Sequence, residues 1–180
     1  MENTTNATAT KSRMLTGMFN DRQSAEGAYS ALESRGYSKD DVNIMMSDET
    51  RKKHFNEDAP HTDLGNKALE TAGKGSAIGG TVGAIIGAVA AIGTSVLIPG
   101  LGLLVAGPIA AGLAGAGAGS LAGGIVGALV GSGIPEDRAK EYEEGVKNGR
   151  IVMGVKARND EDADYFENHW KENKAEGLYR

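Results

Sequence analysis

Cysteine is absent from the 180-residue sequence, and aromatic residues make up only 5% of it. The lack of cysteine excludes disulfide bonds, thiolate catalysis and cysteine-ligated zinc. The net charge is −5, so the chain also lacks the positive excess with which many nucleic-acid binders neutralise phosphates. We therefore expect no nucleic-acid partner.

Charged residues and histidine are missing altogether between Gly75 and Pro135. Small residues recur at every fourth position in two rows: Gly75, Gly79, Gly83 and Gly87, then Ala111, Gly115, Gly119, Gly123, Gly127 and Gly131. Residues four apart share one face of an α-helix, and small residues there let two helices approach closely. Because each glycine in a water-exposed helix costs about 1 kcal/mol relative to alanine, this spacing predicts helix packing rather than a linker.

The spacing predicts an antiparallel hairpin of two helices over residues 75–133. The first helix is expected to run from Gly75 to Val96 or Ile98 and the second to start between Leu103 and Pro108. The turn between them is expected at Pro99, Gly100 and Gly102.

Polar segments on both sides of this stretch predict a small α/β domain. Residues 13–19 and 41–47 alternate as strands and enclose a helix that Asn20 or Asp21 caps, which predicts two parallel neighbouring strands. After the stretch, Pro135 opens a helix with Glu136 and Asp137 in its first turn. A strand at 150–157, a helix from Asp160 and a tail at 177–180 follow.

The predicted fold class is therefore α/β (α+β), a small βαβ–αβα ferredoxin-like sandwich interrupted by the Gly/Ala-rich helical hairpin. We expect a disordered arm at 1–12, the α/β domain at 13–47 plus 134–175, a polar loop and helical lead-in at 48–74, and the hairpin at 75–133.

No catalytic, cofactor or metal site emerges from the sequence, and we expect a protein that is not an enzyme. Gly115, Gly117 and Gly119 lack the strand and acidic residue of a dinucleotide site. His54 and His61, with Glu57, Asp58 and Asp63 nearby, match no metal-ligand spacing and are interpreted as a solvated loop. We expect no cofactor and no small-molecule substrate.

A helix that is apolar all round must be buried in lipid or in protein. As a helix, residues 75–98 would span ~36 Å, enough for a hydrocarbon core of ~30 Å. Lys74, Arg138 and Lys140 then lie on one side, which predicts a cytoplasmic-membrane hairpin with both termini in the cytoplasm. The alternatives are a soluble cytoplasmic homo-oligomer that buries its hairpins in a shared core and a pore-forming or membrane-permeabilising protein.

Four segments resemble a family of bacterial stress proteins described as heat-induced, general-stress or low-temperature-induced. They are the Leu15–Phe19 strand with its helix, the glycine-zipper hairpin with its Ile98–Gly102 turn, Gly131–Ala139 running to Tyr142, and Gly149–Val155. The resemblance implies a stress-associated, non-enzymatic protein, and it supplies no catalytic residues. The expected partners, further copies of the chain and membrane lipid, follow from the charge-free hairpin instead.

Overall fold

The computed structural model describes residues 13–55, 96–98, 102–115 and 124–180. Strand β1 (Arg13–Phe19), helix α1 (Arg22–Ser34) and strand β2 (Val42–Ser47) confirm the elements predicted before the uncharged stretch. Asp21 caps α1, since its carboxylate accepts a hydrogen bond from the Ser24 amide at 2.8 Å. Gly36 ends the helix with a φ of +72°.

The elements after the uncharged stretch are α7 (Glu136–Lys147), β5 (Ile151–Ala157), α8 (Asp160–Glu172) and β6 (Glu176–Tyr179). Glu136 and Asp137 lie in the first turn of α7 as predicted, and Pro135 occupies the N-cap position just before it. The predicted tail was wrong, because most of it forms β6, which pairs with β1.

Six strands form one sheet in the order β3-β4-β2-β5-β1-β6, and every pair for which a register is given is antiparallel. The prediction that β1 and β2 are neighbours was wrong, because β5 lies between them and pairs with both. Ile151, Met153 and Val155 bury one face of β5 and Val152 buries the other. A strand that is apolar on both sides gains most from a central position.

Strands also replace the helix ends that were predicted around the turn of the uncharged stretch. Val96–Ile98 forms β3 and Leu103–Ala106 forms β4, which pair with each other from Ile98↔Leu103 to Val96↔Val105. Ile98 precedes a proline, a position that disfavours helix, and β4 lies between Gly102 and Gly107, both at positive φ. The described part of this stretch therefore begins with a β-hairpin.

Two further helices follow β4, namely α5 (Pro108–Gly115) and α6 (Gly124–Gly131). The predicted start of the second helix between Leu103 and Pro108 is confirmed at Pro108. A single helix through to Gly131 is not, because Gly124 has a φ of +56°, which no right-handed helix passes through. No helix in the described residues is both long and apolar enough to cross a membrane.

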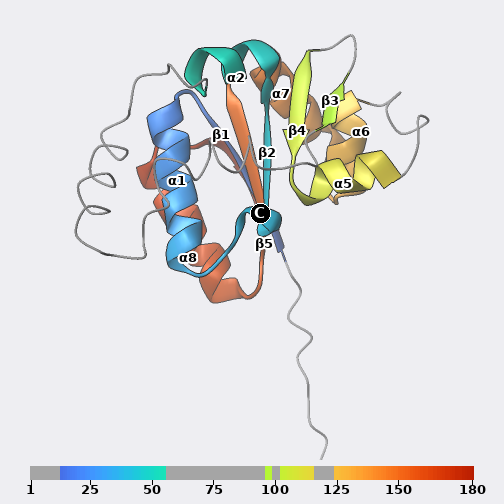
Figure 1. The fold of residues 1–180 in the computed structure, drawn as a ribbon. Helices are drawn as coiled ribbons and strands as arrows, with labels where there is room; N and C mark the ends of the chain where they lie inside the picture. Colours follow the sequence, from blue (N-terminus) through green and yellow to red (C-terminus); the bar gives the residue numbers. More distant parts are fainter. Residues whose placement is uncertain (1–12, 56–95, 99–101, 116–123) are drawn as a thin grey trace, which may run out of the picture.

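Residues 48–54, predicted as loop, form helix α2 (Asp48–His54), which the Ser47 hydroxyl caps through the Thr50 amide. A short 3₁₀ turn at Lys39–Asp41 precedes β2. Figure 1 shows the sheet between two helical layers, with α1 and α8 on one face and α5, α6 and α7 on the other. Each layer has its own buried apolar cluster.

Candidate functional site

Helices α5 and α6, which we call the α5–α6 cover, lie over one face of the sheet and carry the described part of the predicted packing surface (Figure 1). Asn43 of β2 fixes the start of α5, because its side-chain oxygen accepts a hydrogen bond from the Ile109 amide at 2.7 Å. Gly107 lies so close to β2 that an added Cβ would overlap the Val42 carbonyl oxygen. The cover is therefore attached to the sheet at a defined point.

Large aliphatic residues hold the inner side of α6. Ile125 and Leu129 are fully buried and share an apolar cluster with Met45 and Val152 of the sheet and with Tyr142 of α7. One side of α6 therefore faces protein rather than solvent.

The outer side of α6 carries small residues and one large apolar side chain. Gly127 and Gly131 are exposed, and so is Val130 between them, at 43%. Among the residues whose burial the structure describes, Val130 is the one large hydrophobic residue that is exposed. Ala111 of α5 is exposed as well. No ionisable residue occurs in either helix, so this outer side is uncharged.

Most glycines whose surroundings are described have a local reason to be glycine. Gly17, Gly27, Gly145 and Gly154 leave no ordinary room for a Cβ, and a positive φ explains Gly36, Gly102, Gly107, Gly133, Gly149 and Gly177. Gly131 has neither reason, because an added Cβ would meet nothing within 4 Å. An exposed helical glycine with free space around it lowers helix stability and gains nothing from this fold.

The remaining predicted packing residues are only partly covered by the structure. Gly115 is the last residue of α5, whereas Gly75, Gly79, Gly83, Gly87, Gly119 and Gly123 lie outside the described residues. At the turn, Gly102 is exposed at a φ of +59°, and Pro99 and Gly100 lie outside the described residues. The whole first row of small residues thus lies outside the described residues, and of the second row the structure describes Ala111, Gly115, Gly127 and Gly131.

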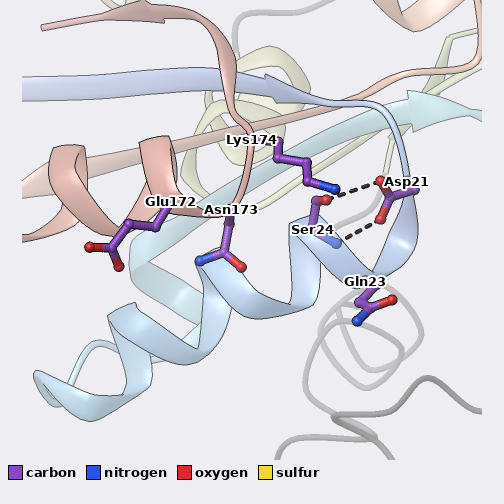
Figure 2. Close-up of a pocket in the computed structure, with 6 residues that line it drawn as sticks. All are labelled: Asp21, Gln23, Ser24, Glu172, Asn173 and Lys174. Atoms are coloured by element: carbon purple, nitrogen blue, oxygen red, sulfur yellow. Dashed lines mark hydrogen bonds between the residues drawn. The ribbon is translucent and has the colours of Figure 1, made fainter.

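A second candidate site is a shallow polar pocket of about 250 Å³ where the start of α1 meets the end of α8. Figure 2 shows Lys174 extending toward Asp21 and Ser24. The rest of the lining is Gln23, Glu172 and Asn173. Asp21 and Ser24 already bond each other in the cap of α1. Small-molecule sites are usually larger and mostly apolar, so this pocket is a weak candidate.

Buried ionisable groups occur in both layers but do not form a reactive set. Burial raises the pKa of Tyr142 to about 12, although its hydroxyl contacts the Thr16 hydroxyl at 2.8 Å and donates to the Gly177 carbonyl at 2.6 Å. Burial, together with nearby acidic residues, likewise raises the pKa of Tyr29 to about 12. Both phenols are therefore held neutral at ordinary pH and act as packing groups.

The loop histidine weighed as a metal ligand, His54, ends α2 on a half-buried site. Burial, then Lys53 and Arg22, lower its pKa. Arg22 donates to the His54 carbonyl at 2.8 Å and forms an ion pair with Glu26. His61, Glu57, Asp58 and Asp63 lie outside the described residues, among which no three His, Asp or Glu residues are placed to hold a metal ion.

Asn43 is a contact residue that the sequence pattern did not single out. It is 2% exposed, and its amide also donates to the Gly154 carbonyl at 3.4 Å. The available signal was a polar residue inside a strand whose neighbours are apolar.

No family model, curated protein or solved structure matches this chain.

Proposed function

We propose that the protein is a non-enzymatic, stress-associated protein that assembles with further copies of itself through the uncharged stretch, with the outer side of α6 as one contact surface. The observation that carries this proposal is Gly131. Nothing in the described fold requires a glycine at this position, because a side chain there would meet free space. A second helix packed closely against the α6 backbone would require one. The stress association rests on the sequence resemblance alone.

A second copy is the partner that suits this surface best. Gly127 and Gly131 form a groove, and Val130 beside it forms a ridge, so one helix carries both halves of a packing contact. Two copies related by a twofold axis present the same patch to each other, and a patch with both a groove and a ridge can be self-complementary.

We further propose that the strands β2-β5-β1-β6 with α1 and α8 form a ferredoxin-like core that acts as an interaction head. Two β-α-β units, β1-α1-β2 and β5-α8-β6, interleave in this order with both helices on one face. In this view α7 and the α5–α6 cover are additions on the second face, and the uncharged stretch is an insertion between the two units.

Membrane anchoring is the second candidate, and the observation that favours it is the charge-free run from Gly75. The described helices of the uncharged stretch have eight residues each and would span only ~12 Å, well below the ~30 Å of a hydrocarbon core. This candidate therefore rests on the first half of the uncharged stretch. A membrane hairpin would place both termini of the chain in the cytoplasm. A membrane-permeabilising activity would rest on the same half.

The decisive experiment compares the native mass of the wild type with that of Gly131→Leu, by sedimentation or by light scattering after gel filtration. The wild type is expected above the monomer mass of 18.6 kDa. Because Gly131 faces open space, leucine leaves the monomer folded and fills the groove, so the mass should fall toward that of the monomer.

The matched control is Asn168→Leu, which places the same side chain at an exposed position of α8, on the opposite face of the sheet (Figure 1). It should keep the wild-type mass. A monomeric wild type, or an unchanged mass in Gly131→Leu, would contradict self-assembly through α6. A carbonate wash of cell membranes, followed by dye release from vesicles, separates assembly in solution from anchoring and from permeabilisation.

A further inference from the structure

The turn that joins α7 to β5 holds the one Asn-Gly sequence of the chain, Asn148–Gly149. Asn148 is exposed at the C-cap of α7, and Gly149 follows it with a φ of +86°. An asparagine before glycine is the pair most prone to deamidation, since glycine has no side chain to hinder attack by its backbone nitrogen. The sequence therefore offers a chemical modification site on the protein surface.

The reaction requires a backbone geometry that the folded turn does not provide. The Gly149 nitrogen must attack the side-chain carbonyl carbon of Asn148, which forms a cyclic imide and releases ammonia. Water then opens the ring at either carbonyl and leaves aspartate or isoaspartate. In the fold, Asn148 has a ψ of 13°, which keeps the Gly149 nitrogen turned away from its side chain.

Hydrogen bonds hold the turn in this unreactive form. The Gly149 amide donates to the Val146 carbonyl at 3.1 Å, and the Arg150 amide donates to the Gly145 carbonyl at 2.9 Å, so the helix ends in a double backbone cap. The buried Thr50 hydroxyl of α2 donates to the Gly149 carbonyl at 3.2 Å. The Gly149 nitrogen, which would have to attack, is thus held in a hydrogen bond, and the Gly149 carbonyl is held by α2.

We propose that Asn148 is a deamidation site gated by folding, which is modified only when the last turn of α7 opens. Modification adds a negative charge at the C-terminal end of a helix, where the helix dipole disfavours it. The isoaspartate product also adds a backbone carbon between residues 148 and 149 and breaks the double cap. Deamidation then prevents the turn from closing again and loosens the junction between α7 and the central strand β5.

The test follows the full-length protein at mildly alkaline pH in native buffer and in urea. Cleavage after glutamate yields a fragment of residues 145–161, in which mass spectrometry separates Asn148 from its products. The rate in urea should exceed the native rate by about tenfold or more, because only opened turns react. Thr50→Val should raise the native rate, whereas Ser34→Ala, which removes an exposed hydroxyl elsewhere, should not.

Asn148→Gln should give no product in either condition and identifies the modified residue. Equal rates in native buffer and in urea would overturn the gating. No product in urea would overturn the site itself.

Discussion

Helices α1 and α8 cover one face of the sheet with charged outer sides, whereas α5 and α6 cover the other face without a single ionisable side chain. The first layer is joined by polar contacts between its helices. Tyr37, just after α1, donates to Asp162 of α8 at 2.8 Å, Arg35 pairs with Glu161 at 3.0 Å, and the Trp170 ring nitrogen donates to the Ala28 carbonyl at 3.2 Å.

In the described part of the α5–α6 cover, contacts are mainly aliphatic and the Asn43 amide is the buried polar link to the sheet. The two layers thus differ in what faces outward. The α1–α8 layer has a polar surface suited to water, whereas the described outer side of α6, with its small residues and Val130, is apolar and suited to another apolar surface. Burial of one side of a helix therefore does not establish what its other side contacts.

Truncating the central side chain of each layer should give the largest effects. Trp170→Ala should lower the free energy of unfolding by about 4 kcal/mol, because Trp170 is fully buried against Phe19 with ring centroids 5.6 Å apart. Leu129→Ala in α6 should lower it by about 3 kcal/mol, in keeping with a smaller side chain. Urea unfolding followed by circular dichroism measures both. A larger loss from Leu129→Ala would mean that the α5–α6 cover, not the α1–α8 layer, dominates stability.

The same residue type caps one helix in each layer, which allows a matched comparison. Asn43 accepts from the start of α5 while buried, and the exposed Asn159 accepts from the Asp162 amide of α8 at 2.7 Å. Asn43→Ala should cost about 2 to 3 kcal/mol because it leaves a buried amide without a partner, and Asn159→Ala about 1 kcal/mol. Hydrogen exchange should rise near Ile109 in the first variant and near Asp162 in the second. Equal losses of stability would show that the Ile109 amide finds water when Asn43 is removed.

The sequence predicted the α1–α8 layer better than the α5–α6 cover, for physical reasons. Strand alternation at Leu15 and Phe19 and the cap at Asp21 are local signals, and the structure confirms both. The pairing of β5 between β1 and β2 depends on contacts between distant residues, so no local pattern reports it. Glycine spacing fits a helix, but it does not reveal that Val96–Ile98 and Leu103–Ala106 are strands, because short apolar runs suit either form.

Alkaline pH compares a buried phenol in each layer. The folded pKa is about 12 for both Tyr29 and Tyr142, above the ordinary value of 10. Between pH 10 and 12 the unfolded chain loses phenol protons that the folded chain keeps. The contribution of these phenols to the free energy of unfolding is therefore fully present below pH 10 and is lost as the pH rises toward 12. Each tyrosine should contribute roughly 2 kcal/mol to this loss. Tyr29→Phe and Tyr142→Phe should each flatten the curve of unfolding free energy against pH, and an unchanged slope in either would mean that its phenol is already solvated.

The smallest effect concerns Lys174, which follows α8 with a φ of +58° and is the one non-glycine residue at positive φ among the described residues. Lysine is strained in this left-handed region, whereas glycine is not, so Lys174→Gly should raise the free energy of unfolding by up to about 1 kcal/mol. Glu172→Gly, two residues earlier in the last turn of α8, is the matched control and should lower it by a similar amount, because glycine weakens a regular helix. Opposite signs in thermal unfolding would show that backbone conformation decides the outcome at the end of α8. A loss of stability in both variants would instead mean that the Lys174 side chain, which extends toward Asp21, stabilises the α1–α8 layer by more than its backbone strain costs.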